Sequence, residues 1–393
     1  MAALRFAAAL LGWRMRLLTA WSADDISLVL GVNRDADYPD AEREEAECLA
    51  IVTPDDPSPW LDASPSTLVA AASRATWTGV ANQLSRAHVD WPIIDDVARA
   101  TRDPGLGIRG SKLGIRDSGL GSRDLGLGSR DTELETRRIA DSELPSPQTR
   151  LPSPESPAPG SDARTIILQR RSALGFDARS SLPRATFLRM LARLRPGAPP
   201  WDAIDWPPQV HLLIFVHRVD GMTPGLYAYL RDEAVVEEWR TAMRAEFLWE
   251  RVPPNDPNDP NDPNDPNALY LLVPTDVTWV ANRLSCDQDI AADGFFSLGM
   301  IARVESSVRD RGDAFYRRLF WESGVIGQVL YLEAEAAGAR GTGIGCFYDD
   351  PVHEMAGLSG FEWQSLYHFS MGVPVDDGRL TTEPGYDWER PAT

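Results

Sequence analysis

One short group of residues is suited to holding a phosphate. Arg170, Arg171 and Ser172 follow an apolar-rich stretch, Ile166 to Leu168, that predicts the first helix of a domain. Two guanidinium groups and a hydroxyl near a helix end suit a phosphate monoester, because arginine offers forked donors and a permanent charge. On this evidence alone a solvated basic patch is the simpler interpretation.

A second group is the glycine-rich sequence GTGIGC, in which Gly341, Gly343 and Gly345 precede Cys346. A backbone without side chains can approach a flat ligand closely and offer N–H groups to it. A dinucleotide-binding fingerprint is not indicated, since no third glycine follows at the required spacing and FYDDP replaces the expected helix start. A glycine-rich turn without a ligand is an equally good interpretation at this point. Cys346 could be a reactive thiol, although a small buried residue is the better interpretation.

A third candidate is Arg379 in the sequence DDGR, a single cation after the last expected strand. It could add charge to a phosphate site, but a lone arginine is most often only a surface residue.

The sequence lacks the residue patterns that several other kinds of active or metal site require. His353 and Glu354 begin an HExx sequence, but Gly357 stands where a second zinc-binding histidine would be needed. No G-x-S-x-G elbow and no Walker loop occurs. The three cysteines are far apart in sequence and form no C-x-x-C pair, so no metal site and no disulfide framework is predicted. The scattered histidines are expected to be core or edge residues, with His211 and His217 on one face of a strand.

The elements that must position these groups are predicted from apolar periodicity. Strands are expected at residues 210–219, after the DGMTPG turn in LYAYL, at 268–274 and at 366–372. Helices are expected after Pro183, over about 287–308 with Ile290, Phe295, Leu298 and Ile301 inward, and over about 324–337. Strands separated by turns and by paired helices favour an α+β sheet covered by helices over a regular βαβ series.

The chain divides into four parts by composition. Residues 1–65 predict an N-terminal helix, a helix that begins after Ser22 and a strand at CLAIV, and residues 66–101 predict a helical arm. Residues 102–160 are Gly-Leu-Gly-x-Arg-Asp repeats followed by a Pro/Ser-rich stretch, which predicts a disordered linker. The main domain is expected over residues 161–393, with an Asn-Asp-Pro surface insert at 253–267.

The overall charge of the chain excludes some classes of binding partner. A formal net charge of -19 argues against a nucleic-acid or anionic-membrane surface, because an acidic protein repels phosphate groups. The first residues are better interpreted as an amphipathic helix than as a signal peptide, since Arg14 and Arg16 follow the apolar run and no cleavage site is evident. A cytoplasmic location is therefore expected, with a small molecule or a peptide as the substrate.

Four segments in order resemble the nitroreductase family: the RRS group, the stretch CDQDIAADGFFSLGMIARV, the stretch ESGVIGQVLYLEAEAAGARGTGIGCFYDDPV and the ending YHFSMGVPVDDGR. Within the family they look most like the azoline- and thiazole-forming dehydrogenases of peptide natural-product pathways. The match covers about residues 164–388. The first block, up to about residue 65, also resembles the closing part of a second such module, so we expect it to be a partial remnant.

The resemblance implies a mostly antiparallel sheet flanked by helices, a homodimer, and FMN bound at the dimer interface. By the matching positions, Arg170, Arg171 and Ser172 would hold the phosphate end and Arg379 would add charge there. Gly343 would belong to the strand that faces the ring, and the backbone at Gly345 and Cys346 would donate toward N5. The implied activity is ping-pong hydride transfer with NAD(P)H or an organic substrate as reductant. FMN carries such chemistry, so no acid–base dyad is required and no catalytic residue is assigned.

Two departures from the family pattern leave a second interpretation open. The basic residue usual two positions after RRS is replaced by Leu174, and the family's Pro-Ser-Ala-Gly type segment is not recognisable before the first long strand. A missing cation there should disfavour the anionic reduced flavin by about 1–3 kcal/mol. The alternative is a nitroreductase-like scaffold without cofactor that docks a peptide or a partner enzyme.

Overall fold

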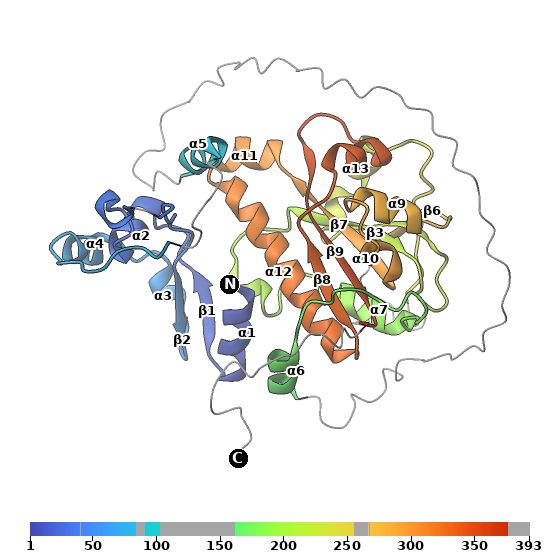
Figure 1. The fold of residues 1–393 in the computed structure, drawn as a ribbon, viewed down its shortest axis with the longest axis horizontal. Helices are drawn as coiled ribbons and strands as arrows, with labels where there is room; N and C mark the ends of the chain where they lie inside the picture. Colours follow the sequence, from blue (N-terminus) through green and yellow to red (C-terminus); the bar gives the residue numbers. More distant parts are fainter. Residues whose placement is uncertain (40, 84–90, 103–161, 255–265, 267, 376–393) are drawn as a thin grey trace.

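A computed structural model describes residues 1–39, 41–83, 91–102, 162–254, 266 and 268–375 of the chain. A seven-stranded sheet with helices on both faces lies beside a smaller N-terminal part, and the long helix α12 runs between them (Figure 1). The architecture is the mixed α+β fold expected from the sequence.

The sheet is antiparallel throughout, with strand order β5-β6-β4-β3-β7-β9-β8. Its strands are β3 (Val210–Val216), β4 (Gly225–Tyr229), β5 (Glu250–Arg251), β6 (Leu269–Val273), β7 (Phe296–Arg303), β8 (Arg340–Ile344) and β9 (Trp363–Gly372). β8 thus forms one edge of the sheet and β5 the other. The strands predicted around 210–219, at LYAYL, at 268–274 and at 366–372 are confirmed.

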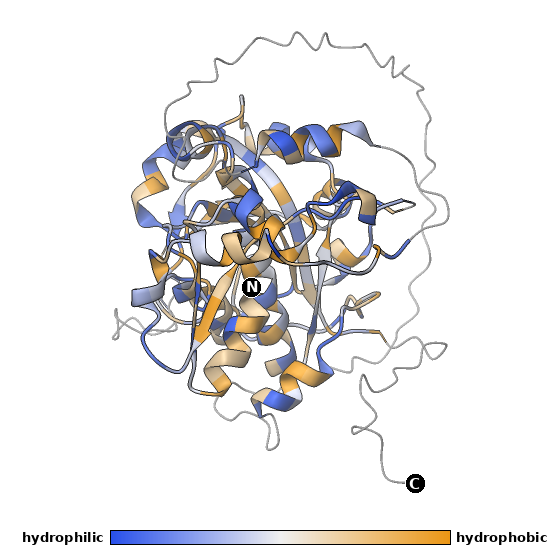
Figure 2. Ribbon diagram, turned by 90° about the vertical axis from the view of Figure 1, so that its left-hand side faces the viewer, coloured by the Kyte–Doolittle hydropathy of each residue, from blue (hydrophilic) through white to orange (hydrophobic). Residues whose placement is uncertain are grey.

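Helices cover both faces of the sheet. On one face lie α7 (Arg184–Ala192) and α12 (Phe315–Ala336), which share one hydrophobic core with β3, β7 and β9. On the other lie α8 (Val236–Ala242), α9 (Thr278–Leu284), α10 (Ile290–Asp293) and α13 (Asp349–Ala356), which enclose a second core. Every residue of β3 is buried for this reason, and its run of apolar residues matches a strand covered on both faces. Apolar and polar residues alternate around the helices in Figure 2, as expected where one side of each helix is buried.

The helix predicted over residues 287–308 is wrong. That segment contains the short helix α10, the central strand β7 and the helix α11 (Glu305–Arg311). The i, i+3 spacing of Leu298 and Ile301 suggested a helix, but the strand sends Leu298 and Ile301 to opposite cores. A short apolar run buried on both faces carries no period that separates strand from helix.

A buried ion pair ties α12 to the sheet. The carboxylate of Glu322 pairs with the guanidinium of Arg231, and the two side chains are 0% and 1% exposed. The same carboxylate accepts hydrogen bonds from the indole of Trp206 at 3.1 Å and from the backbone N–H groups of Gln209 at 3.1 Å and Val210 at 3.2 Å. Four donors therefore converge on one carboxylate at the start of β3, where the 3-10 helix η3 (Trp201–Ala203) also packs.

The N-terminal part has a small two-stranded sheet of its own. It contains α1 (Ala2–Leu10), β1 (Arg14–Leu17), α2 (Ala23–Leu30), the 3-10 helix η1 (Asp35–Asp37), β2 (Ala50–Thr53), α3 (Ser58–Leu61), α4 (Ser66–Ala72) and α5 (Pro92–Ala100). Ser22 begins α2 as expected, through a reciprocal capping box with Asp25. Arg5 of α1 pairs with Asp202 at 2.6 Å, which fastens this part to η3.

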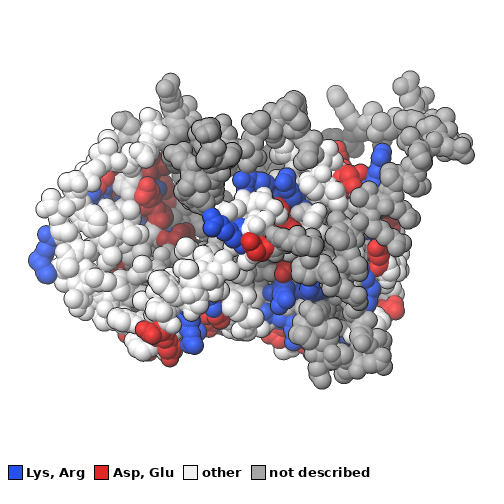
Figure 3. Space-filling model, turned by 90° about the horizontal axis from the view of Figure 1, so that it is seen from below, with Lys and Arg blue, Asp and Glu red and all other residues white. Residues whose placement is uncertain are grey.

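Several predictions lie outside the described residues. The linker at 102–160 falls there apart from Arg102, as do Arg379 and most of the insert at 253–267. Among the helices that the structure does describe, none combines the length and apolar character needed to cross a membrane. Acidic and basic side chains are interspersed on the face drawn in Figure 3, without a large patch of one sign.

Candidate functional site

The RRS group lies at the end of a helix, as predicted. The helix α6 (Ala163–Gln169) begins at Asp162, whose side chain accepts a hydrogen bond from the N–H of Thr165 at 2.7 Å. It ends at Arg170, which leaves the helical conformation with ψ near 125°. The chain then continues in extended form, and Ser172 pairs with Gly341 of β8 in a parallel bridge.

A tyrosine joins the RRS group to the glycine strand. The hydroxyl of Tyr331, on α12, lies 3.0 Å from the Ser172 hydroxyl and accepts the N–H of Gly343 at 2.9 Å. The guanidinium of Arg170 lies over the ring of the same tyrosine, 4.9 Å from its centroid. The structure therefore brings Arg170 and Ser172 together with the distant Gly343 around one side chain.

Arg171 is differently placed. Its guanidinium turns back onto the end of α6 and donates to the carbonyl oxygens of Leu168 and Arg170, both at 2.8 Å. Its backbone N–H donates to the carboxylate of Glu335 at 3.2 Å, and Glu335 also lies 3.5 Å from Arg340. Burial raises the pKa of Glu335, while the Arg171 N–H and Arg340 act in the opposite direction. Arg171 thus closes the helix end instead of pointing an open fork at an anion.

The three glycines of β8 differ in what surrounds them. A Cβ on Gly341 would lie 2.3 Å from the Phe369 ring, and one on Gly343 would lie 2.6 Å from the Tyr367 hydroxyl. These two glycines are needed for packing whether or not a ligand binds. At Gly345 the nearest atom to such a Cβ belongs to Tyr367 at 3.7 Å, so this position has room.

The end of the glycine strand offers free backbone donors. In the part of the chain that the structure describes, no hydrogen bond uses the N–H of Gly345 or of Cys346. The Cys346 carbonyl accepts from the Gln288 amide at 3.0 Å, which holds this turn against the segment after α9. Cys346 is exposed, so the expectation of a small buried residue is wrong. Its residue type suggested burial, but the turn leaves the sheet edge.

Leu174, the main departure from the family pattern, is 69% exposed. It contributes little to the core, because it lies in the extended segment that follows RRS. Arg379, the other expected phosphate ligand, lies outside the described residues.

The histidines expected in the core are found there. His211 and His217 are buried, and so is His368. Burial lowers the pKa of His217 to about 4 and that of His368 to about 3. No group of three or more potential metal ligands gathers among the described residues.

Two functional candidates were not foreseen from the sequence, Tyr331 and Glu335. They are four residues apart on α12 and therefore share one helical face, which is the face that meets residues 171–172 and β8. A tyrosine and a glutamate at this spacing near the end of an apolar helix were the available signal. Apolar periodicity predicted the helix there, but it did not single out these two polar residues.

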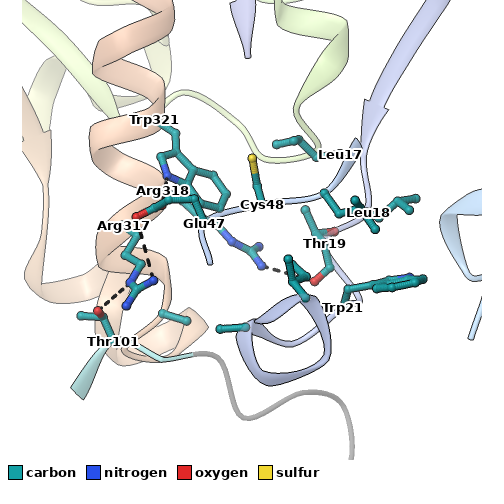
Figure 4. Close-up of a pocket in the computed structure, with 14 residues that line it drawn as sticks. Leu17, Leu18, Thr19, Trp21, Glu47, Cys48, Thr101, Arg317, Arg318 and Trp321 are labelled. Atoms are coloured by element: carbon teal, nitrogen blue, oxygen red, sulfur yellow. Dashed lines mark hydrogen bonds and ion pairs between the residues drawn. The ribbon is translucent and has the colours of Figure 1, made fainter. Parts of the chain in front are cut away.

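A small hollow lies between α12 and the N-terminal part (Figure 4). Its volume of about 40 Å³ has room for only a few water molecules. Arg317 donates there to the Thr101 hydroxyl at 2.8 Å and to the Ala98 carbonyl at 2.9 Å, and Trp321 donates to Glu47 at 2.8 Å. These contacts fasten the N-terminal part to α12, and the hollow is too small for an organic substrate.

Comparisons with known proteins agree with this fold. A structure of a nitroreductase candidate from Anabaena variabilis aligns with a TM-score of 0.54 at 16% identity, over 95% of this chain and 63% of that one. This chain therefore spans less than two thirds of that protein's length. No curated protein matches the chain.

Two other solved structures align less closely. The microcin synthetase McbBCD complex of Escherichia coli gives a TM-score of 0.37 at 15% identity, over 62% of this chain and 79% of that one. A nitroreductase-type protein from Exiguobacterium sibiricum, in complex with FMN, gives 0.30 at 14% identity, over 57% and 93%. Neither is close enough to carry an argument about this chain.

The family model described as the nitroreductase family matches residues 167–373, which is more than half of the 393 residues. The matched region runs from α6, through the whole seven-stranded sheet, to the end of β9. On this evidence the chain belongs to the nitroreductase family.

Proposed function

We propose that this protein is an FMN-dependent oxidoreductase that works by ping-pong hydride transfer. The family membership supports an oxidoreductase of the nitroreductase type. We further propose that NAD(P)H or an organic substrate reduces the flavin, that the protein acts as a homodimer in the cytoplasm, and that peptide natural-product maturation is its setting. The motifs that resemble the azoline-forming branch motivate this last point.

The observation that carries the proposal is the junction at Tyr331. Its hydroxyl contacts both Ser172 and Gly343, and its ring lies under Arg170. A helix end that bears a cation and a glycine strand with unused donors thus adjoin each other at one edge of the sheet. A ligand with an anionic tail and a flat polar ring needs this combination of groups.

The residues present fit FMN at most, though not all, positions. Arg170 would hold the phosphate, with Ser172 as a hydroxyl donor and Arg379 as a second cation. Gly345 and Cys346, whose N–H groups bond to none of the described residues, would donate to the ring edge, and Gly343 would let the strand lie close. When bound, FMN supplies the two-electron chemistry, and the protein's part is to bind and orient it.

Leu174 is expected to influence the reduction potential of the bound flavin. Without a cation near the position where negative charge develops on reduction, the reduced anionic form is less stabilised. The introduced charge in Leu174→Arg should raise the reduction potential of the bound flavin, and Leu174→Met is the matched control because it keeps the site neutral. Equal potentials in all three proteins would show that Leu174 does not face the reducible ring.

The first experiment is an absorbance spectrum of the purified full-length chain. We expect a yellow protein with one FMN per chain that bleaches with NADH or NADPH. A colourless protein that takes up no added FMN would reject the proposed enzyme.

The phosphate assignment has its own test. Arg170→Ala should weaken FMN binding by about 1.5–3 kcal/mol, the loss of one charged hydrogen bond, which is about 10- to 150-fold in Kd. Riboflavin, which has no phosphate, should be much less affected. Arg251→Ala is the matched control, because Arg251 lies on β5 at the opposite edge of the sheet. Unchanged FMN affinity in Arg170→Ala would place the phosphate elsewhere.

A second candidate function is a cofactor-free scaffold that docks a peptide or a partner enzyme. The exposure of Leu174 and the engagement of the Arg171 guanidinium by backbone carbonyls favour it. Stoichiometric flavin that is reduced by a nicotinamide would eliminate this alternative.

A further inference from the structure

Two of the three cysteines come from distant parts of the sequence and lie in adjacent turns at the surface. Cys286 follows α9, and Cys346 follows β8. The turns that carry them are held together, because Gln288 donates to the Cys346 carbonyl at 3.0 Å and the N–H of Tyr348 donates to the Leu284 carbonyl at 2.9 Å. These two bonds hold the turn of Cys286 against the turn of Cys346.

The two cysteines are close enough for their thiols to influence each other, since Cys346 is the largest cause of a raised pKa of Cys286. Both cysteines are free, Cys346 is exposed and Cys286 is partly exposed, so a small reagent can reach the pair. Cys286 and Asp287 have φ values of 57° and 56°, in the left-handed region that L-residues rarely adopt. This strained turn breaks the helical course of the chain after α9.

We propose that Cys286 and Cys346 form a reversible dithiol–disulfide site that is oxidised by low-molecular-weight disulfides. The proposal does not require bound flavin. In a reducing compartment such a surface pair is a transient, responsive bond and not a permanent structural one.

The exchange proceeds in two balanced steps. The thiolate of the more exposed Cys346 attacks one sulfur of the small disulfide RSSR, which forms a mixed disulfide and releases one RS⁻ that takes up the proton lost by Cys346. The thiolate of Cys286 then attacks the Cys346 sulfur, which forms the intramolecular bond and releases the second RSH. The net reaction converts two protein thiols and one RSSR into one protein disulfide and two RSH.

The neighbouring Cys346 thiol, followed by burial, raises the pKa of Cys286. The second step should therefore accelerate as the pH rises above neutrality, since only the thiolate attacks. The sulfurs must approach to about 2.05 Å for the bond to form.

The site has a consequence for the glycine strand. Cys346 directly follows Gly345, so an intramolecular bond would clamp the end of β8 to the turn after α9. If the proposed function is correct, oxidation would alter the donors that face the flavin edge.

The test uses the full-length chain with Cys48→Ser, which leaves only Cys286 and Cys346 among the three cysteines. The protein is incubated in glutathione buffers of increasing oxidised fraction, quenched with iodoacetamide and analysed by intact mass and peptide mapping. We expect a loss of two hydrogens, no alkylation, and one peptide that links residues 286 and 346. The linked peptide should form without added FMN, so the outcome does not rest on the proposed function.

Two single variants and a denatured sample complete the test. Cys286→Ser and Cys346→Ser should stop at the glutathione adduct, with an adduct lifetime at least about tenfold longer than in the protein that has both thiols. In denaturant the preference for the intramolecular bond should largely disappear. Glutathione adducts on both cysteines, disulfide-linked dimers, or two thiols that remain alkylatable in every buffer would each overturn the proposal. None of these outcomes depends on whether the chain binds FMN.

Discussion

Replacing Glu322 should cost more stability than any single surface substitution. The carboxylate pairs with buried Arg231 and accepts from the Trp206 indole and from the N–H groups of Gln209 and Val210. Glu322→Ala leaves the Arg231 charge buried and unpaired, which costs about 3–5 kcal/mol, and leaves three N–H donors without their acceptor. We expect a total loss of at least about 4 kcal/mol, because water that enters the new space can satisfy only some of these donors.

The magnitude is large against the whole stability of a typical protein, which is about 5–15 kcal/mol. Urea unfolding followed by tryptophan fluorescence measures it. Glu237→Ala is the matched control, since Glu237 forms an ion pair with Arg240 at 3.6 Å but is 83% exposed. An exposed pair of this kind contributes only about 0–1 kcal/mol.

A double-mutant cycle separates the free energy of the Glu322–Arg231 interaction from the free energy lost when a cavity forms. If the two charges depend on each other, Glu322→Ala combined with Arg231→Ala should cost at least about 2 kcal/mol less than the sum of the single changes. A loss below about 1 kcal/mol in Glu322→Ala, equal to that of the control, would refute the assignment of this carboxylate as the tie between α12 and the sheet.

Three further predictions address the site and the core. Tyr331→Phe should weaken FMN binding roughly tenfold in fluorescence titrations while leaving the far-UV spectrum unchanged, because it removes only the bridging hydroxyl; unaltered binding would remove the junction from the argument. Burial lowers the pKa of His217 to about 4 in the folded protein, against 6.5 in the unfolded chain. Between pH 6.5 and 4 the unfolded chain therefore binds more protons, so the free energy of unfolding should fall as the pH drops through this range. In His217→Gln the dependence of the unfolding free energy on pH should be weaker by about 1.4 kcal/mol per pH unit. Urea titrations at several pH values measure this dependence, and an unchanged dependence would contradict the lowered pKa of His217. Gly341→Ala should destabilise by about 1–3 kcal/mol because its Cβ would meet the Phe369 ring, whereas Gly345→Ala, which has room, should fold normally; equal melting temperatures would contradict this difference.

The local sequence was sufficient to predict a helix or strand where its residue pattern fits only one structure. The apolar run of β3 could only be a buried strand once turn residues bounded it, and Ser22 with Asp25 could satisfy the first N–H groups of α2 by a capping box alone. It failed at β7, where apolar residues on both faces remove the alternation that would identify a strand. It also misjudged Cys346, because burial depends on where a turn leaves the sheet.

The sequence by itself determined the family, the α+β class and the residue types available for a phosphate and a flat ring, since each is a matter of local composition and order. Only the tertiary structure decided which of them meet. The Tyr331 hydroxyl joins Ser172 to Gly343, and the Arg171 guanidinium closes the end of its own helix. Glu322 pairs with Arg231, and the turn of Cys286 lies beside the turn of Cys346. Such contacts depend on the docking of helices against a sheet, which no local pattern of residues can encode on its own.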